Sequence, residues 1–318
     1  EKMGELAVYN TDDRLFGELN GDGYGDLLVG YHTDLATSSD TINTVLAPGP
    51  LEGLYARDAW EAVFLESGDK DYFHPQVVSD LTGDGRDDVV RTSSPSIPIN
   101  FYASEDGYGA LGPGEWWGMR YNDAYPRVRA ADWTGDGLSD VGFLDRHLPV
   151  YMHLHEARPG EEPEHPIVWE GPSAATVSEE LPASYTAYND FFFGETNGDG
   201  HVDLMIVVGA ADVYDPVAGT VDVAGGTYII HGPLNDYPDG GLLEGAATVI
   251  RGDMGHYLGG SSAFADINGD GLDDPVLSRG DHTQSYLYYS PLPSGFLVQG
   301  DSNAYFTQGG VRSVGDLN

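Results

Sequence analysis

The chain has 318 residues, with 52 acidic residues against 14 Lys and Arg, and a formal net charge of −38. So negative a chain cannot neutralise phosphates, which argues against a nucleic-acid partner and against electrostatic binding to an anionic membrane. It contains no cysteine, which excludes disulfides and thiolate zinc sites, and no apolar run long enough to predict membrane insertion.

Short stretches rich in β-branched and aromatic residues recur between turn residues, whereas helical periodicity is scarce. Such stretches predict strands. In chain order they are residues 26–32, 43–47, 61–66, 97–103, 148–155, 225–232 and 284–290. The sequence therefore predicts an all-β protein.

An acidic, glycine-rich stretch recurs along the chain and organises it. Its complete copies start at Glu18, Asp80, Asp132, Glu195 and Asp266, and a truncated sixth copy starts at Asp316. The mean spacing is about 60 residues, a period typical of solenoids and propellers. Each period contains about four strand-like segments, which in the first are residues 26–31, 43–46, 61–66 and 76–80. This pattern predicts a single β-propeller domain of four-stranded antiparallel blades over residues 1–318.

The repeated stretch is predicted to be a hairpin loop, because one hydrophobic strand always leads into it and another follows it. Seven blades of this size need roughly 420 residues, more than the chain has. We therefore expect a fragment of a longer chain, or a smaller ring closed by residues 4–10 pairing into the last blade. The start at Glu1 has no signal-peptide pattern, so we expect any export signal to have been removed or left out.

The five complete copies place side-chain oxygens at positions 1, 3, 5 and 9, counted from the first acid. Glycine occupies positions 4 and 6, where a chain that wraps a small ion needs positive φ or close approach. Position 7 varies, as expected of a ligand supplied by the backbone carbonyl. The candidate metal ligands, copy by copy, are Glu18, Asn20, Asp22, Tyr24 and Asp26; Asp80, Thr82, Asp84, Arg86 and Asp88; Asp132, Thr134, Asp136, Leu138 and Asp140; Glu195, Asn197, Asp199, His201 and Asp203; and Asp266, Asn268, Asp270, Leu272 and Asp274.

Hard oxygen ligands with three carboxylates favour Ca²⁺, and five loops predict about five structural ions. Magnesium usually keeps more of its own water, and zinc prefers His or Cys. Simple Asx turns would explain one copy, but not the same oxygens in five. An EF-hand needs flanking helices and a bidentate Glu at position 12, where the first copy has Val29 and a strand is predicted.

The loops and their strands resemble the FG-GAP repeat of the integrin α-chain β-propeller. The resemblance is carried by the loops together with residues 257–277 and 203–233. Leu258-Gly259 stands where the repeat has Phe-Gly, and residues 209–211 stand where it has Gly-Ala-Pro; the second and third copies lack both phrases. The resemblance implies an extracellular or cell-surface propeller, stabilised by calcium, that binds a protein or cell-surface ligand in adhesion.

Two rival functions use the same features. A calcium-dependent polysaccharide lyase would be the enzyme alternative, but it needs a basic residue near its substrate and the sequence shows no basic cluster. A glycan-binding propeller without catalysis is the third candidate. Arg-Gly-Asp, an integrin ligand motif, occurs at residues 251–253 and 279–281, both in predicted turns. We expect a non-enzymatic binding module.

Overall fold

The computed structural model describes sixteen stretches of the chain. They are residues 14–19, 21–32, 42–47, 61–65, 74–92, 100–102, 115–116, 127–144, 151–155, 167–170, 189–209, 212–215, 220–234, 246–253, 255–259 and 261–307. The contacts divide the chain into two compact units, residues 1–130 with 157–164 and residues 131–156 with 165–318. The prediction of a single domain stays a prediction.

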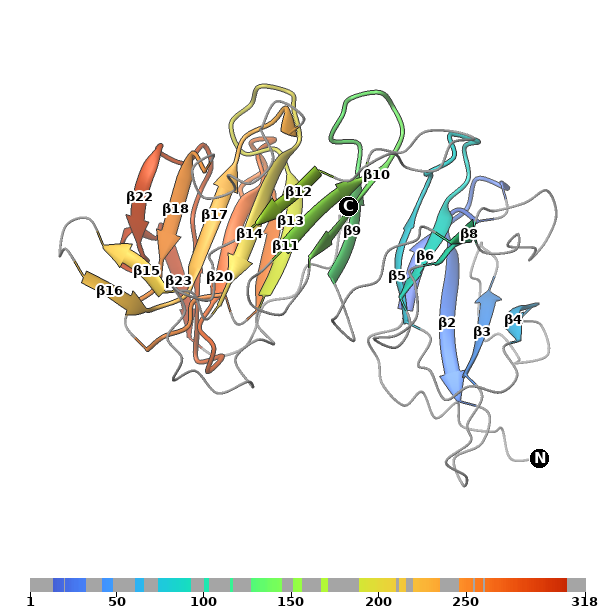
Figure 1. Cartoon of the computed structure of the whole chain (residues 1–318), viewed down its shortest axis with the longest axis horizontal. Helices are drawn as coiled ribbons and strands as arrows, with labels where there is room; N and C mark the ends of the chain where they lie inside the picture. Colours follow the sequence, from blue (N-terminus) through green and yellow to red (C-terminus); the bar gives the residue numbers. More distant parts are fainter. Residues whose placement is uncertain are drawn as a thin grey trace. The chain divides into compact units, whose positions relative to one another are not determined.

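The first unit contains two four-stranded antiparallel sheets, each with its strands in chain order (Figure 1). The first sheet comprises β1 (Arg14–Gly17), β2 (Asp26–His32), β3 (Ile42–Ala47) and β4 (Glu61–Leu65). The second comprises β5 (His74–Ser79), β6 (Asp88–Thr92), β7 (Asn100–Tyr102) and β8 (Glu115–Trp116). The first strands of the two sheets, β1 and β5, are in contact.

Three further sheets follow along the chain. The third comprises β9 (Arg127–Ala131), β10 (Asp140–Leu144), β11 (Tyr151–His155) and β12 (Ile167–Glu170). The fourth comprises β13 (Asn189–Gly194), β14 (Asp203–Val208), β17 (Gly226–Ile230), β18 (Thr248–Arg251) and β22 (Gly295–Val298). The fifth comprises β19 (Ser262–Ala265), β20 (Asp274–Ser278), β21 (Gln284–Leu287) and β23 (Ala304–Thr307). A separate hairpin, β15 (Asp212–Asp215) and β16 (Thr220–Val223), is inserted between β14 and β17.

The predicted all-β class is confirmed, because the described residues contain many strands and almost no helix beyond η4 (Gln299–Asp301), a short 3-10 turn. Each of the seven predicted strand segments contains or overlaps an observed strand. None of the helices in the described stretches is long and apolar enough to cross a lipid bilayer. The predicted sixth loop copy and the predicted closing segment, residues 4–10, lie outside the described residues.

The grouping of strands by period was wrong by one strand. The sequence pattern places residues 76–80 as the last strand of the first period, but residues 76–79 belong to β5, which pairs with β6 and opens the second sheet. The reason is the short loop itself, because a tight connection joins strands that are antiparallel neighbours in one sheet. Each sheet therefore begins with the strand before its loop.

The fourth sheet has five strands, one more than predicted for a blade. The added strand β22 comes from the fifth repeat and pairs with β18 in parallel, from Thr248 opposite Gly295 to Arg251 opposite Val298. Thr248 also donates a hydrogen bond from its Oγ1 to the carbonyl of Pro293 at 3.0 Å. An uncovered edge strand leaves backbone groups unpaired, and β22 supplies their partners at β18.

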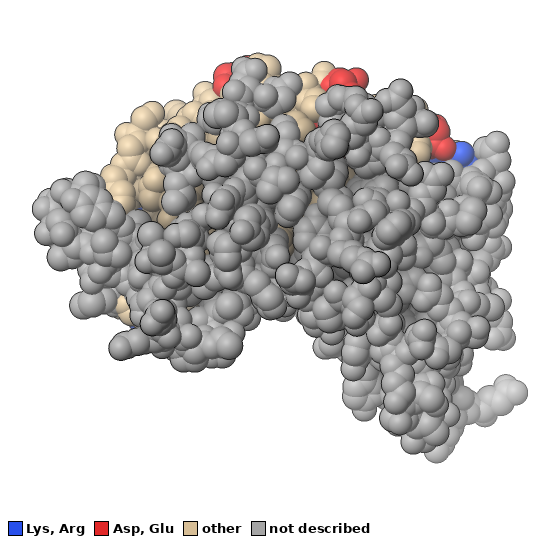
Figure 2. Space-filling view, in the orientation of Figure 1, with Lys and Arg blue, Asp and Glu red and all other residues tan. Residues whose placement is uncertain are grey.

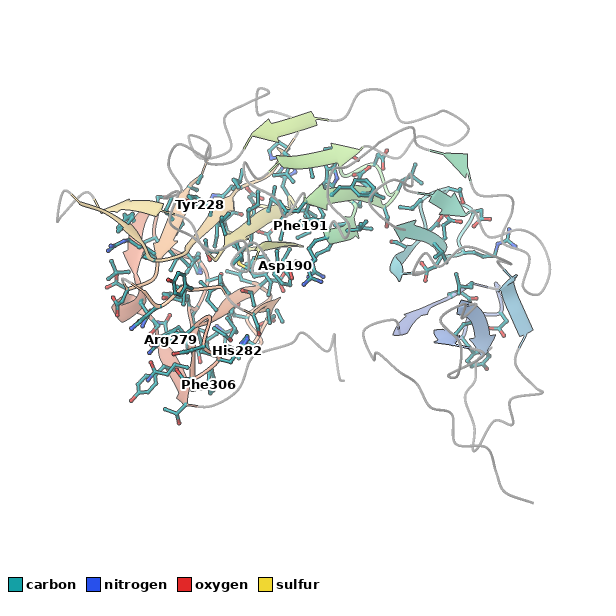
Figure 3. The ribbon with its side chains drawn as sticks, turned by 60° about the horizontal axis from the view of Figure 1, so that its bottom comes forward. Asp190, Phe191, Tyr228, Arg279, His282 and Phe306 are labelled. Carbon is teal, nitrogen blue, oxygen red and sulfur yellow. The ribbon has the colours of Figure 1, made fainter. Side chains whose placement is uncertain are left out.

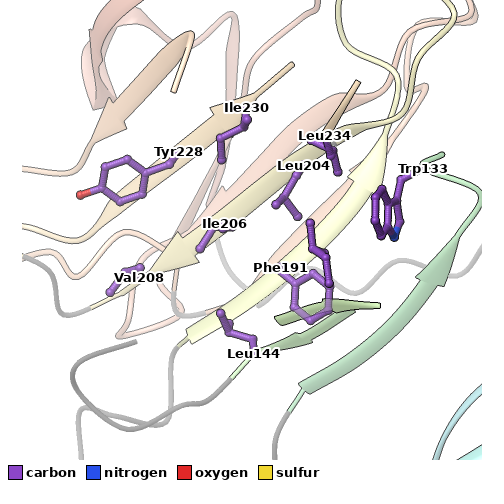
Figure 4. Packing of buried hydrophobic residues seen from close by; sticks show 10 residues of the cluster. Trp133, Leu144, Phe191, Leu204, Ile206, Val208, Tyr228, Ile230 and Leu234 are labelled. Atoms are coloured by element: carbon purple, nitrogen blue, oxygen red, sulfur yellow. The ribbon is translucent and has the colours of Figure 1, made fainter. Parts of the chain in front are cut away.

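Two hydrophobic clusters cover the two faces of the fourth sheet. Leu204, Ile206 and Val208 of β14 pack in a cluster with Trp133, Leu144 and Leu154 of the third repeat (Figure 4). The alternate residues of β14, Met205 and Val207, pack with Phe264, Leu277 and Tyr286 of the fifth repeat. All six residues of β14 are buried, because successive side chains of a strand point to opposite faces and both faces are covered. Consecutive repeats of this unit therefore stack face to face.

Candidate functional site

Each complete loop connects two neighbouring strands of one sheet, as predicted. The loops join β1 to β2, β5 to β6, β9 to β10, β13 to β14, and β19 to β20. In every copy the acid at position 9 is the first residue of the following strand. A strand at this point confirms that the loops are not EF-hands, which continue into a helix.

The carboxylate at position 1 is held by backbone N–H groups of its own loop. In the fifth loop, Asp266 accepts hydrogen bonds from Gly269 at 2.6 Å and from Gly271 at 2.8 Å. The corresponding N–H groups at positions 4 and 6 bond to the position 1 carboxylate in the other four loops. The glycines at positions 4 and 6 all have positive φ, between 75° and 93°, as predicted. This backbone turns its N–H groups inward onto an anionic side chain.

The acid at position 9 is fully buried and bonds back to the start of its own loop. Asp26, Asp88, Asp140, Asp203 and Asp274 are all 0% exposed. In each copy one carboxylate oxygen accepts the N–H of position 2, at 2.8–3.1 Å. The other oxygen reaches the next turn in two copies: Asp203 accepts from Gly232 and Asp274 from Ser290, both at 2.8 Å. Burial raises the pKa of both of these carboxyls.

The acid at position 5 is exposed in every loop and accepts the N–H of position 7 at 2.8–2.9 Å. At position 3, Asn197 and Asn268 donate to the acid at position 5 of their own loops. Thr134 donates to Asp140, whereas the buried Oγ1 of Thr82 has no hydrogen-bond partner among the described atoms. Asn20 lies outside the described residues. Positions 1, 5 and 9 thus make the same hydrogen bonds in every copy, whereas the described residues at position 3 differ in their partners.

The donor set suits calcium in its chemistry, because the sequence of each short loop carries three carboxylates and a neutral side-chain oxygen. Nowhere in the described stretches are three or more Asp, Glu or His side chains gathered as a group that could hold a metal ion. The carboxylates at positions 1 and 5 instead accept N–H groups of the loop. In Figure 2 the exposed acidic atoms of the described residues lie in small separate groups. Calcium binding stays a prediction.

The second loop differs from its sisters by an internal cation. Arg86 at position 7 forms a salt bridge with Asp84 at position 5, with 2.6 Å between Nη2 and Oδ2. Its Nε donates to the same oxygen at 3.2 Å. Although burial opposes it, the hydrogen bonds and charge of Arg86 lower the pKa of Asp84. At position 7 only the backbone carbonyl is expected to bind the ion, but the side chain of Arg86 already neutralises Asp84, one of the candidate ligands.

Two acids that were not predicted as site residues connect neighbouring loops. Asp273 at position 8 accepts a hydrogen bond from the N–H of Glu195 at 2.9 Å and returns its own N–H to the Glu195 carbonyl at 2.6 Å. Asp87 makes the same pair of bonds with Glu18, at 2.7 and 2.6 Å. Each bond pair joins position 8 of one copy to position 1 of the preceding copy, so these acids couple consecutive repeats.

This coupling occurs at the two copies that begin with Glu rather than Asp. Glu18 and Glu195 are the position 1 acids whose backbones pair with an acid of the next loop. The longer side chain still reaches the N–H groups at positions 4 and 6. A glycine precedes both Glu residues, and at Gly194 a Cβ atom would come within 2.5 Å of Asp273 Oδ2. A sequence signal for this coupling was available: a copy that begins with Gly-Glu is followed by a copy with Asp at both positions 8 and 9.

The electrostatic surroundings of these two acids are similar. Burial, together with the charges of Asp80, Glu18 and Asp26, raises the pKa of Asp87. Burial and the charges of Asp266 and Glu195 raise the pKa of Asp273. Both carboxylates are therefore costly to ionise in the folded protein unless a cation offsets the repulsion.

Neither Arg-Gly-Asp sequence presents its arginine and aspartate as separate exposed groups. Arg251 is 7% exposed, and Arg279 forms a salt bridge with its own Asp281 at 2.9 Å. Both glycines face neighbouring residues too closely for a Cβ atom, which would lie 2.2 Å from the Ala224 carbonyl oxygen at Gly252 and 2.9 Å from Tyr257 Cβ at Gly280. Close packing thus accounts for both glycines.

Comparison with known proteins gives neither a matching family model nor a matching curated protein. Among solved structures, a rhamnogalacturonan lyase, YesW, is 14% identical with a TM-score of 0.41, over 89% of this chain and 61% of the lyase. The α-L-arabinofuranosidase PaAbf62A from Podospora anserina, solved with cellotriose, is 11% identical with a TM-score of 0.36, over 76% and 74%. The Photorhabdus luminescens Tc holotoxin pore is 16% identical with a TM-score of 0.35, over 86% and 13%. The chain thus spans about three fifths of the lyase. Because the TM-scores of these three structures are below 0.5, the function is argued from the residues of this chain.

Proposed function

We propose that the chain is a calcium-stabilised extracellular binding module in which each four-stranded sheet is one blade of an FG-GAP-type propeller. The observation that carries the proposal is the hydrogen-bond pattern at positions 1, 5 and 9, which repeats in all five loops. In each, glycines with positive φ at positions 4 and 6 turn N–H groups onto the first acid, and the last acid is buried at 0% exposure. If the five loops were only tight turns, they would not need side-chain oxygens at the same positions 1, 3, 5 and 9.

Calcium would be held by positions 1, 3 and 5, the carbonyl of position 7 and, where a lone pair remains, position 9. When bound, the ion supplies charge neutralisation: five ions would reduce the net charge from −38 to about −28. The loop carboxylates at positions 1 and 5 would then exchange part of their backbone hydrogen bonding for coordination. The Oγ1 of Thr82, which lacks a partner among the described atoms, would gain one.

The propeller arrangement is supported by the order of the sheets. Each sheet begins at the strand before its loop, and the fourth sheet packs between the third and fifth through β14. Face-to-face stacking of successive sheets is what a blade array requires. With the ions on one end of the strands, the turns at the other end would present the ligand site, for a protein or cell-surface partner.

Calorimetric titration of the metal-free chain with Ca²⁺ tests the proposal. We expect about five sites and a rise in melting temperature, because an ion relieves the repulsion among the carboxylates of each loop. Magnesium at the same concentration is the control and should stabilise less. No heat of binding and an unchanged melting temperature in excess EDTA would refute the calcium role.

A calcium-dependent polysaccharide lyase is the second candidate, and one observation favours it. The sequence shows no basic cluster, yet Arg279 and His256 belong to one hydrogen-bonded network in the folded chain. Of the two side chains only the imidazole of His256 could take a proton from a sugar, because the guanidinium of Arg279 stays protonated. Asp253 and Asp281 lie beside them and oppose an acidic sugar, which keeps the lyase second. Incubation with acidic polysaccharides, followed by the ultraviolet absorbance of an unsaturated product, separates the two functions. A calcium-dependent increase in absorbance would establish the enzyme.

A further inference from the structure

The two Arg-Gly-Asp turns, 28 residues apart in the sequence, meet at the ends of strands away from the calcium loops. The strand β20 starts at the fifth loop with Asp274, and the turn 279–283 follows its far end. Arg251 pairs with Gly226, which pairs with Val208 at the far end of β14. His256 joins the turns, since its carbonyl accepts from Gly280 at 3.1 Å and its N–H donates to the Asp253 carbonyl at 2.9 Å.

A buried amide connects the side chains of both turns. Gln299, 4% exposed, donates from Nε2 to the Tyr286 hydroxyl at 2.6 Å. Its Oε1 accepts from the Asp253 N–H and lies 3.3 Å from His256 Nδ1. The Tyr286 hydroxyl donates to Gln284 at 2.6 Å, and Arg279 Nη1 lies 3.5 Å from the same amide oxygen. This chain of contacts, the polar network, runs from Asp253 through Gln299 to Arg279 and Asp281.

The network is buried at its centre and exposed at its two ends. Tyr286 and Gln299 are below 9% exposed, whereas the side chains of Asp253 and Asp281 are 61% and 47% exposed. Each exposed carboxylate lies beside a donor: His256 Nδ1 is 3.6 Å from Asp253, and Arg279 Nη2 is 2.9 Å from Asp281. The buried Nε of Arg279 has no hydrogen-bond partner among the described atoms. Polar groups held in place by a buried network are preorganised for a ligand.

Backbone strain is concentrated at the same place. Tyr257 and His282, with φ of 48° and 55°, are the two non-glycine residues with positive φ among the described residues. His282 lies in the second turn, and Tyr257 follows the first turn and faces Gly280 of the second. Such conformations cost roughly 1 kcal/mol or more and cluster at binding and active sites. His282 lies next to Arg279 in Figure 3, and its N–H bonds to the Arg279 carbonyl at 2.9 Å.

Aromatic side chains stand exposed on the neighbouring edge strand β23. Tyr305 is 64% exposed and is paired with Tyr286 of the network, and Phe306 is 50% exposed and is paired with Ser285. Side chains of directly paired residues share a face of the sheet, which places Tyr305 on the face of Tyr286. An exposed aromatic ring beside fixed polar groups offers one apolar and one hydrogen-bonding surface.

We propose that this surface binds a neutral carbohydrate, and the proposal rests on the binding function proposed above. Each carboxylate with its adjacent donor suits a vicinal diol, because one hydroxyl donates to the carboxylate while the other accepts from the adjacent N–H donor. Tyr305 would stack on the C–H face of a sugar ring. An anionic ligand is opposed by the exposed Asp253 and Asp281. A basic peptide would use only the carboxylates and compete with Arg279.

The test is a glycan array of neutral cello-, xylo-, manno-, galacto- and arabino-oligosaccharides, followed by calorimetric titration of the strongest binder. We expect Asp281→Asn and Tyr305→Ala each to weaken binding about tenfold or more. Tyr289→Ala is the matched control, since Tyr289 is 40% exposed but follows β21 at the calcium end. Calcium binding should be unchanged in the Asp281→Asn variant, because Asp281 follows the end of β20 that lies away from the fifth loop.

Three results would overturn the carbohydrate proposal. These are an array without binding while calcium still stabilises the chain, equal losses in the Tyr289→Ala control, and preferential binding of a Lys- and Arg-rich peptide included on the array. The first leaves the calcium-stabilised module standing. A chain that calcium does not stabilise refutes the function proposed above whether or not sugars bind.

Discussion

At the scale of single residues, the position within a loop decides the role of an acid more than its chemistry does. The acid at position 9 is buried and anchors the loop, the acid at position 5 is exposed, and the acid at position 8 bridges to the preceding copy. Glu195 and Asp273 show the consequence, because a change in one loop's first acid accompanies a change in the next loop's eighth residue. Substitutions at these positions test whether the assigned roles are separable.

Asp273→Asn should stabilise the metal-free protein at neutral pH and lose this advantage in acid. The pKa of Asp273 is raised above its ordinary value of 3.8, so the folded chain holds this proton more tightly than the unfolded chain. The cost of the charged form is therefore fully present at neutral pH and is relieved as the pH falls through the raised pKa. The Asn oxygen can still accept from Glu195.

Urea unfolding in EDTA at pH 7 and at about pH 4.5 measures this difference in the free energy of unfolding. The control is Asp301→Asn, an exposed acid outside the loops. A gap between wild type and Asp273→Asn that stays the same at both pH values would contradict the assignment.

Arg86→Leu should strengthen calcium binding at the second loop. The substitution releases Asp84 from its salt bridge and introduces the residue found at position 7 of the third and fifth loops. A partly exposed ion pair contributes up to about 1 kcal/mol, so we expect a two- to fivefold gain, roughly. Calorimetric titration measures it, and Leu272→Arg in the fifth loop should have the opposite effect. Unchanged affinity in both variants would show that Arg86 does not compete with the ion.

At the scale of elements, the loops predict which strands are neighbours in a sheet, but they do not predict how many strands each sheet contains. The loop predicts a hairpin, and five hairpins are observed. The extra strand β22 could not be predicted, because residues 295–298 have an ordinary strand composition and nothing local tells which sheet they join. Pairing with β18 is decided by the unpaired edge that the fourth sheet presents.

The central strands of the fourth sheet provide a test of packing through the pKa of Tyr228 in β17. The ring lies in the cluster with Leu204 and Ile206, is 5% exposed, and burial raises its pKa to about 12 (Figure 4). The folded state therefore holds the phenolic proton between pH 10 and 12 while the unfolded chain loses it, so stability falls as pH rises through this range.

Tyr228→Phe should remove this part of the alkaline loss, by up to about 2–3 kcal/mol between pH 9 and pH 12. Urea unfolding at both pH values measures it. Tyr289→Phe is the control, because Tyr289 is 40% exposed. If wild type and Tyr228→Phe lose stability equally between these pH values, the Tyr228 hydroxyl is not shielded from solvent as the structure shows.

At the scale of the whole molecule, the dominant fact is the net charge of −38. Self-repulsion of this size destabilises a compact state, and salt screens it over a Debye length of about 10 Å at 0.1 M. Raising sodium chloride from about 0.05 M to about 0.5 M should therefore raise the melting temperature in EDTA. The rise should be smaller with saturating calcium, because bound ions already remove part of the charge. Equal salt slopes in the two conditions would contradict this account.

The sequence alone determined the all-β class, the five loops, their hairpin position and the positive φ of their glycines. These features depend on residues within about a dozen positions of one another, so local spacing encodes them. Only the tertiary structure decided that Asp273 meets Glu195, that β22 leaves its own repeat, and that two Arg-Gly-Asp turns converge on Gln299. Those contacts join residues up to 78 positions apart. Which of them form depends on how whole sheets stack and which edges they leave unpaired.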